Sequence, residues 1–132
     1  MTASSAESFD PAEARALIAR GSSGNVAATA ADADDPPLRP RLLPLTLPDA
    51  ADAVTRAIAS RARWRVTGRS DRVIRATRTT RLFRFVDDIL VLLESDGGAT
   101  RVLARSASRI GRRDFGQNRR NLAELWRALG TG

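Results

Sequence analysis

With 132 residues, the chain is long enough for one domain and a flanking segment, and too short for a multidomain enzyme or an α/β barrel. It contains neither cysteine nor histidine, which excludes disulfides, thiol nucleophiles, histidine-based catalytic triads and most zinc sites. Apolar residues make up 42% of the sequence and charged residues 28%, so the composition is typical of a protein with a packed core.

Arginine supplies all of the positive charge, because none of the 22 basic residues is lysine. Residues 1–35 hold six acids and two arginines (net −4), whereas residues 36–132 hold nine acids and twenty arginines (net +11). A GC-rich genome explains a preference for arginine, and the paired N–H groups of guanidinium, which bind phosphate or carboxylate, give a functional explanation. The charge layout leaves the partner open between an anionic ligand, nucleic acid, an acidic protein and an anionic membrane surface.

Residues 1–35 are expected to form an acidic leader with a short helix and a linker. Asp10, Pro11 and Glu13 are typical of a helix start and Gly21 of a helix end, but the apolar side of this helix is mostly alanine. Residues 22–35 are rich in Ala, Ser, Gly and Asp, as flexible linkers are. The sequence therefore predicts one domain over residues 36–132.

The expected domain begins with an edge strand and a helix. Prolines within residues 38–47 exclude a helix interior but permit an edge strand. Three leucines share one face of this strand: Leu43, Leu45 and Leu47. A helix follows from Pro48, and period 3.6 places four apolar residues in one stripe: Ala50, Val54, Ala57 and Ile58.

Four strands and a last helix complete the expected domain. The strands span residues 64–66, 73–79, 83–93 and 100–107, with a hairpin turn at Asp96, Gly97 and Gly98. The helix spans residues 114–129, and its stripe comprises Phe115, Leu122, Leu125, Trp126 and Leu129. The order β-α-β-β-β-β-α predicts an α+β fold: a curved antiparallel sheet with two helices packed on one face, in a TATA-binding-protein-like or helix-grip-like arrangement.

Two polar positions interrupt the apolar pattern. Asp87 has the parity of the apolar residues on the long strand and points into the core, unless a β-bulge places Asp88 there instead. Asn118 lies in the middle of the stripe of the last helix. Buried polar groups need partners, so we expect a shared cluster. Its candidate members are Asp87 or Asp88, Arg105 or Arg109, Ser106, Ser108 and Asn118. Such a cluster serves either to fix the sheet against the helix or to bind a ligand.

Arginines crowd the start of the last helix, where free N–H groups and the helix dipole favour anions. We expect an anion-binding surface there, formed by Arg112, Arg113, Arg119 and Arg120. The alternative is a basic face that is only solvated. Aromatic residues are scarce, which argues against a dedicated binder of single-stranded RNA.

The long strand is apolar on both faces, because Leu90 and Leu92 lie opposite Phe83 and Phe85. An exposed apolar patch needs cover, which points to a homodimer through the Leu90 and Leu92 face or to another partner. A related alternative is a carrier that holds an apolar ligand between the sheet and the last helix.

A third interpretation is an Asp-dependent metal enzyme, with Asp87, Asp88 and Asp114 as oxygen ligands or one Asp as a base. The usual companions are missing from the sequence: it has no histidine, no phosphate-binding Gly loop and no nucleophile elbow. We therefore expect a non-enzymatic binding or structural domain, with no cofactor and no catalytic residues.

Three runs of sequence, at residues 80–88, 105–111 and 114–119, are similar to one known family. They resemble the uncharacterised bacterial and plastid family catalogued as domain of unknown function fourteen-ninety-nine, and the similarity spans residues 42–129. The resemblance implies the same α+β domain and no established activity. Many members resemble secreted, lipid-anchored or membrane-associated proteins, which implies a membrane-peripheral location as the alternative. The default expectation is the cytoplasm, because no signal peptide or transmembrane segment is recognisable.

Overall fold

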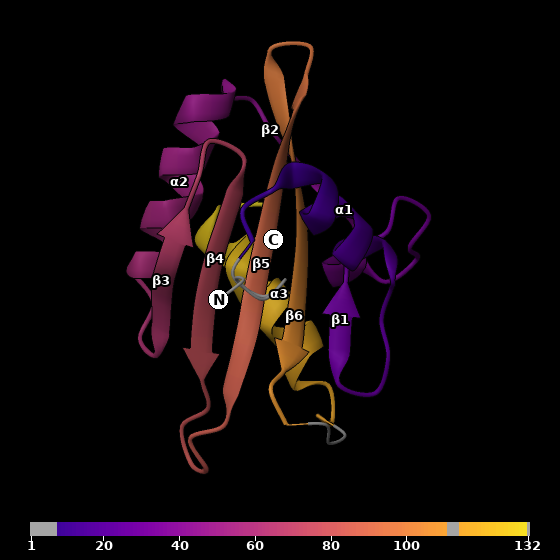
Figure 1. The fold of residues 1–132 in the computed structure, drawn as a ribbon, viewed down its shortest axis with the longest axis vertical. Coiled ribbons are helices and arrows are strands. Elements are labelled where there is room, and N and C mark those ends of the chain that lie inside the picture. The colour runs from indigo at the N-terminus through magenta and orange to yellow at the C-terminus, as the bar shows by residue number, and fades with distance from the viewer. Residues whose placement is uncertain (1–7, 111–113, 132) are drawn as a thin grey trace.

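The centre of the fold is an antiparallel sheet of six strands (Figure 1). The computed structural model describes residues 8–110 and 114–131. In chain order the strands are β1 (Val26–Ala28), β2 (Arg41–Leu43), β3 (Trp64–Arg69), β4 (Val73–Thr79), β5 (Val86–Asp96) and β6 (Ala99–Ser108). They lie in the order β1-β6-β5-β4-β3, and β2 pairs with the first part of β6. The expected α+β class with an antiparallel sheet is confirmed.

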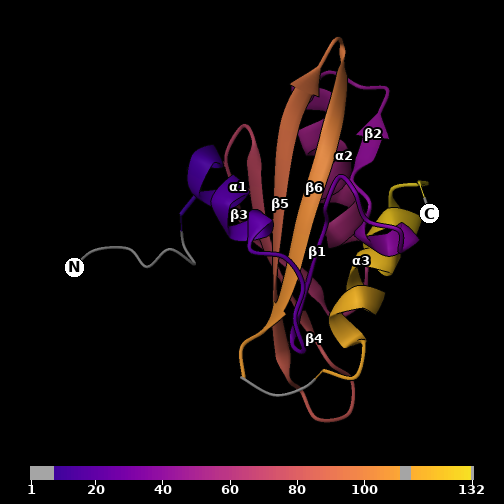
Figure 2. The ribbon, with the colours of Figure 1, turned by 90° about the vertical axis from the view of Figure 1, so that its right-hand side faces the viewer.

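Helices cover both faces of this sheet (Figure 2). The helices are α1 (Pro11–Ala19), α2 (Leu47–Ala59) and α3 (Gln117–Ala128), and a short 3-10 turn, η2 (Pro36–Leu38), precedes β2. Both α2 and α3 pack on one face, as expected, and α1 packs on the other. None of the helices in the described parts of the chain is long and apolar enough to cross a membrane.

The larger core lies between the sheet and the two helices α2 and α3. The predicted stripe of α2 is buried, and Leu122, Leu125 and Trp126 of α3 are at most 1% exposed. They meet alternate residues of β5, namely Ile89, Val91 and Leu93. Burial of each large aliphatic side chain contributes roughly 1.5–3 kcal/mol, so this layer is a main source of stability. The indole of Trp126 also donates a hydrogen bond to the Pro37 carbonyl at 2.8 Å.

The β5–β6 hairpin sets which acidic side chain enters the core. Its register runs unbroken from Asp87 opposite Ser108 to Asp96 opposite Ala99. Gly97 and Gly98 form the turn with positive φ angles of 55° and 88°, as a two-residue hairpin turn requires. Because no bulge shifts the pairing, Asp87 points into the core and Asp88 points to the opposite face.

The segment before residue 36 differs from the expected leader and flexible linker. Val26 to Ala28 pair with β6 as an edge strand, and α1 packs on the sheet through Ala14 and Ile18. This contact covers Leu90 and Leu92, which are 2% and 0% exposed. The patch for which we expected a dimer partner is therefore covered within the same chain, by a helix that would be marginal in isolation.

Several element boundaries also differ from prediction. The long strand starts at Val86, so Phe83 and Phe85 lie in the preceding loop. A bulge between Val66 and Gly68 lets β3 continue past the glycine expected to end it. The strand expected over residues 38–47 spans only Arg41–Leu43, since Leu38 belongs to the 3-10 turn before it and Leu47 to α2 after it.

The last helix starts three residues later than predicted. The helix was expected to begin at Asp114, but Gly116 is its N-cap, and the turn before it places Phe115 in solvent with 80% exposure. Phe115 is therefore not part of the core stripe, a correction to the prediction.

Candidate functional site

A buried polar network joins the sheet to α3. Asp87 is 0% exposed, and its Oδ2 accepts a hydrogen bond from Nδ2 of Asn121 at 2.8 Å. The same amide nitrogen donates to Oγ of Ser106 at 3.0 Å. The Oδ1 atom of Asp87 is buried without a hydrogen-bond partner among the residues that the structure describes. A carboxylate held by one neutral amide depends strongly on that amide.

The network continues from Ser106 to the start of α3. Ser106 donates from its hydroxyl to Oδ1 of Asn118 at 2.6 Å. In turn, Nδ2 of Asn118 lies 2.9 Å from Oγ of Ser108, 3.0 Å from the Asn25 carbonyl and 2.5 Å from Oδ2 of Asp114. Asn118 therefore ties α3 to β6, to the segment before β1 and to the turn before its own helix.

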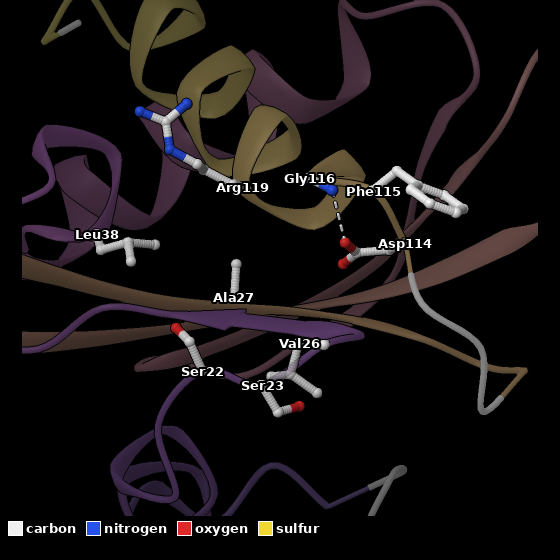
Figure 3. A pocket seen from close by; sticks show the side chains of 10 residues that line it. Ser22, Ser23, Val26, Ala27, Leu38, Asp114, Phe115, Gly116 and Arg119 are labelled. Carbon is white, nitrogen blue, oxygen red and sulfur yellow. Dashed lines mark hydrogen bonds between the residues drawn. The ribbon is translucent and has the colours of Figure 1, made fainter.

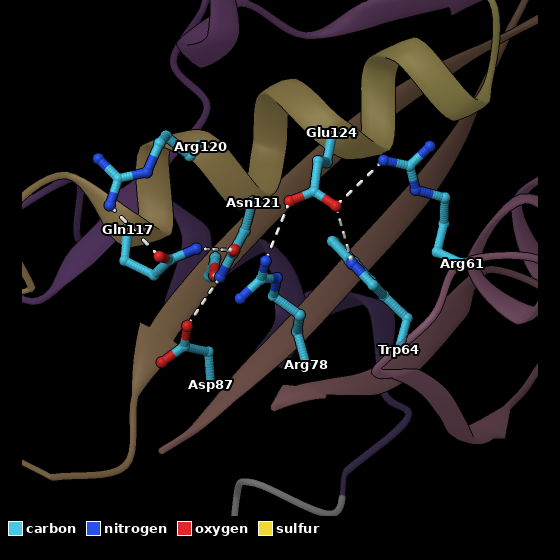
Figure 4. Close-up of polar contacts among 9 residues, drawn as sticks. Arg61, Trp64, Arg78, Asp87, Gln117, Arg120, Asn121 and Glu124 are labelled. Carbon is cyan, nitrogen blue, oxygen red and sulfur yellow. Dashed lines mark hydrogen bonds and ion pairs between the residues drawn. The ribbon is translucent and has the colours of Figure 1, made fainter. Parts of the chain in front are cut away.

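A second branch of the network leads from the core to the surface (Figure 4). Oδ1 of Asn121 accepts from Nε2 of Gln117 at 2.8 Å, and Oε1 of Gln117 accepts from Arg120 at 3.3 Å. Arg120 also donates to the Phe115 carbonyl at 3.1 Å. Gln117 donates to Asn121, and Asn121 donates to Asp87, so this chain of hydrogen bonds fixes the orientation of the Gln117 amide.

The outer end of this branch forms one wall of an open cleft of about 650 Å³. We call it the loop cleft, because the connection from β4 to β5 and the start of α3 enclose it. Leu82, Phe83, Phe85 and Phe115 supply its apolar lining. Its cationic side chains are Arg81 and Arg120. Its size and its apolar lining with a few polar groups are typical of small-molecule sites.

The β4–β5 connection is held in shape by contacts within the loop. The backbone N–H of Thr80 donates to the Phe85 carbonyl at 2.7 Å, and the Phe85 N–H donates to the Thr80 hydroxyl at 2.8 Å. The rings of Phe83 and Phe85 stack with centroids 5.7 Å apart. These contacts close the loop and hold its apolar side chains in place, which lowers the entropy lost on binding.

Phe115 occupies an unfavourable position for an aromatic residue. Its φ of 52° lies in the left-handed region, which costs a non-glycine residue about 1–2 kcal/mol, and its ring is exposed. Neither the backbone conformation nor the exposure contributes to folding stability.

A second cleft, of about 430 Å³, lies on the other side of the same turn, between β1 and α3 (Figure 3). The Asp114 carboxylate closes the turn by accepting from the Gly116 N–H at 2.8 Å. Arg119, on the wall of this cleft, forms a bidentate pair with Asp35 at 2.6 and 2.7 Å. The hydrogen bond from Arg119 holds the pKa of Asp35 below its usual value, and the same bond raises the pKa of Arg119.

The structure brings together Asp87, Ser106, Ser108 and Asn118 of the predicted cluster. Neither of the arginines predicted for this cluster belongs to it. Neighbouring residues of a strand point to opposite faces, so Arg105 and Arg109 lie on the face away from α3, with Asp88. Arg109 and Asp88 form an exposed ion pair at 3.1 Å. Burial lowers the pKa of Arg105, whose Nε has no hydrogen-bond partner in the described part of the chain.

The predicted anion-binding surface is only partly visible. Arg112 and Arg113 lie outside the described residues. Arg119 is paired with Asp35, and Arg120 lines the loop cleft. The acidic segment before residue 36 thus neutralises one of the arginines expected to bind an anion.

Sequence reasoning missed Asn121, the direct partner of Asp87. Asn121 lies three residues after Asn118, a spacing that places both amides on one face of a helix, so a signal was present. Arg81 and Leu82 were also missed, because the strand was expected to begin at Phe83 and these residues were given no role.

The geometry also separates the three acids considered for a metal site. Asp87 and Asp88 point to opposite faces of β5, and the Asp114 carboxylate accepts hydrogen bonds from Gly116 and Asn118. No group of three acidic side chains that could hold a metal ion occurs within residues 8–110 and 114–131.

Glu124, about one turn after Asn121 on the same side of α3, anchors the second half of this helix to the sheet (Figure 4). It accepts from Arg61 at 3.1 Å, Arg78 at 3.2 Å and the Trp64 indole at 3.4 Å. Partial burial acts to raise its pKa, but the hydrogen bond from Arg61 and the charge of Arg78 outweigh this, and the pKa lies below its usual value.

We expect the Glu124→Gln variant to be less stable at neutral pH, by at most about 1 kcal/mol. A lowered pKa contributes stability above the unfolded-state value, and this contribution is lost as the pH falls through the folded-state value. The two proteins should therefore converge in stability in acid. Urea denaturation across this pH range measures the difference, and a difference that persists in acid would contradict the prediction.

Three comparisons place the chain among known proteins. A family model described as "Protein of unknown function (DUF1499)" matches residues 16–129. The match includes the end of α1 and all of β1, and it agrees with the resemblance carried by the motif runs. No curated protein matches. Among solved structures, the crystal structure of TTHA0849 from Thermus thermophilus is similar over 68% of this chain and 90% of that chain, with a TM-score of 0.34 and 13% identity.

Proposed function

We propose that this chain, which belongs to the DUF1499 family of proteins of unknown function, is a non-enzymatic binding protein. The loop cleft takes a ligand that has an apolar body and an anionic group. The main support for this proposal is the lining of the cleft. Leu82, Phe83 and Phe115 are exposed there, and they lie beside the guanidinium groups of Arg81 and Arg120.

The chemistry of the lining supports this ligand class. Three large apolar side chains exposed at one place bury their surface only when something occupies the cleft, at about 25 cal/mol per Å² of apolar area. Guanidinium groups at the rim offer paired N–H donors to a carboxylate or phosphate. An anion with an apolar chain satisfies both features at once.

The buried network supports the proposal as the scaffold of the cleft. Gln117 and Asp114 line it, and both are hydrogen-bonded to amides of the core, Asn121 and Asn118. A site whose polar groups are fixed from behind loses less entropy on binding. We assign Asp87 and its partners this supporting role.

The loop cleft is favoured over the space between the sheet and the middle of α3, where we had considered an apolar ligand. Leu122, Leu125 and Trp126 fill that space with fully packed side chains. The loop cleft, in contrast, is open to solvent at one end of the sheet.

Isothermal titration with dodecanoate, below its critical micelle concentration, tests the proposal. We expect saturable binding that weakens by about tenfold for dodecanol, which lacks the charge, and no binding of acetate, which lacks the chain. The Arg81→Gln and Arg120→Gln variants should each bind dodecanoate about tenfold more weakly, because each removes a charge-assisted hydrogen bond to the carboxylate. Arg120→Gln also removes the hydrogen bonds of Arg120 to Gln117 and to the Phe115 carbonyl.

Matched controls sit on other surfaces of the protein. Arg56 is an exposed arginine of α2, and Leu42 is an exposed leucine of β2. The Arg56→Gln and Leu42→Ala variants should bind dodecanoate as the wild type does. Binding that survives Phe83→Ala and Phe115→Ala unchanged would place the ligand elsewhere and refute the proposal.

A further inference from the structure

One end of the molecule carries most of the exposed apolar side chains that the structure describes. Figures 1 and 2 both place the β4–β5 connection, the end of β6 and the start of α3 at the same end of the long axis. Four large apolar residues lie exposed on these two connections, with exposures from 54% to 80%: Leu82, Phe83, Ile110 and Phe115. Only Phe9 and Leu42 are exposed elsewhere among the described residues.

Positive charge surrounds these apolar tips. The β4–β5 connection reads Arg81-Leu82-Phe83-Arg84, and all four side chains are exposed. Within the described residues neither Arg81 nor Arg84 has an ion-pair partner. The acids nearby are already engaged: Asp88 pairs with Arg109, and the Asp114 carboxylate accepts from Gly116 and Asn118.

We propose that this end of the protein docks on an anionic membrane surface. In the docked state Leu82 and Phe83 enter the boundary between headgroups and acyl chains, and Arg81 and Arg84 bind lipid phosphates on either side of them. The inference goes beyond the proposed function, because it rests on tip residues and charges that also lie outside the loop cleft. It names the bilayer as the source from which the cleft draws its amphiphile.

The physical match is to a bilayer interface. Apolar side chains flanked by arginines can insert while the guanidinium groups stay at the level of the phosphates. Each arginine near an anionic surface contributes attraction that salt screens within a Debye length. A fixed loop loses little entropy on insertion, and the hydrogen bonds between Thr80 and Phe85 hold this one closed.

Charge complementarity selects a bilayer over a second copy of this chain. The described residues at this end are arginine-rich, so two copies brought tip to tip would oppose like charges. The Leu90 and Leu92 face, which would have offered an apolar dimer surface, is covered by α1.

Co-sedimentation of the full chain with unilamellar vesicles tests the inference. Vesicles of phosphatidylcholine alone are compared with vesicles that contain one part phosphatidylglycerol to three parts phosphatidylcholine. We expect binding to the anionic vesicles that is at least about tenfold stronger and that weakens as salt is raised. Equal binding to both vesicles, or none to the anionic ones, would overturn the proposal.

Two paired variants separate the apolar contribution from the electrostatic one. Leu82→Ser with Phe83→Ser should reduce binding to anionic vesicles by about tenfold or more. Arg81→Gln with Arg84→Gln should remove the preference for anionic lipid. The controls are Leu42→Ser, and Arg56→Gln with Arg72→Gln, which change the same residue types on other surfaces. Equal losses in the control and tip variants would also overturn the proposal.

A spectroscopic variant checks insertion directly. The native tryptophans, Trp64 and Trp126, are buried in the core at 7% and 0% exposure. In Phe83→Trp, a blue shift of fluorescence on adding anionic vesicles, absent from the wild type, indicates insertion of the tip, and no shift contradicts it. Vesicle binding without dodecanoate binding would refute only the proposed function. Dodecanoate binding without vesicle binding would refute only the docking.

Discussion

Replacing Asn121 by leucine is expected to lower the free energy of unfolding by about 3 kcal/mol. The substitution removes the amide that donates to Asp87 and to Ser106, and both acceptors are 0% exposed. Since Oδ1 of Asp87 has no partner within the described part of the chain, the carboxylate would lose its one hydrogen bond there. Urea denaturation, followed by the fluorescence of Trp64 and Trp126, measures the change.

A double-mutant cycle measures the coupling between Asp87 and Asn121 directly. Asp87→Leu alone removes one acceptor from the Asn121 amide, which still donates to Ser106, and Asn121→Leu alone leaves the carboxylate without its hydrogen bond. The double variant removes both groups, so it should be more stable than the sum of the single changes predicts, by about 2 kcal/mol. Strict additivity would show that the two side chains are not coupled.

The Asp87→Asn variant controls for charge. It keeps an oxygen that can accept from Asn121 and removes the cost of burying a carboxylate. We expect it to lose less stability than Asn121→Leu. If Asp87→Asn keeps its stability and also keeps dodecanoate binding, the network acts only as the scaffold of the loop cleft, as we assign it.

Alternation along a strand made the buried acid predictable. Once a strand is assigned around residue 87, period 2 places Asp87 with Ile89, Val91 and Leu93, and the structure agrees. The partners of Asp87 were harder to predict, because proximity in sequence suggested Arg105 and Arg109. Those arginines leave β6 on the wrong face, and the partner came from α3, where helical spacing from Asn118 leads to Asn121.

The loop cleft could not be predicted from hydrophobic period alone. Phe83 and Phe85 continue the alternation of the long strand, and Phe115 has the spacing of the α3 stripe, so all three were assigned to the core. In the structure the pairing of β4 with β5 ends at Thr79 and Val86, and the chain leaves the sheet before these rings. An exposed apolar residue can have the same periodicity in the sequence as one packed in the core, so the pattern alone does not distinguish them.

The helix α1 was underestimated for a different reason. Its small side chains suggested weak packing, yet Ala14 and Ile18 are each only 2% exposed. They belong to a buried cluster to which the sheet contributes larger side chains, among them Leu90 and Leu92. Judged as an isolated helix it is marginal, but tertiary packing decides its stability.

The Ile18→Asp variant is therefore expected to release α1 from the sheet, at a cost of about 4 kcal/mol to its docking. A carboxylate in place of Ile18 would lie in the buried cluster with Val73, Leu90 and Leu92 and would lose the apolar contacts that the isoleucine makes there. Undocking exposes those side chains to water. Because a contiguous apolar sheet face seeks cover, the variant should associate into dimers or larger species at micromolar concentration.

Light scattering coupled to size-exclusion chromatography measures this association, and thermal unfolding measures the loss of stability. Arg15→Ala is the matched control on the same helix. Arg15 is 54% exposed and pairs with Glu94 at the surface, so its removal should cost less than about 1 kcal/mol and leave the mass unchanged. A monomeric Ile18→Asp variant of unchanged stability would show that α1 is not what keeps the second face of the sheet from water. The Leu90 and Leu92 face would then need another explanation, and its apolar character would again point to a partner.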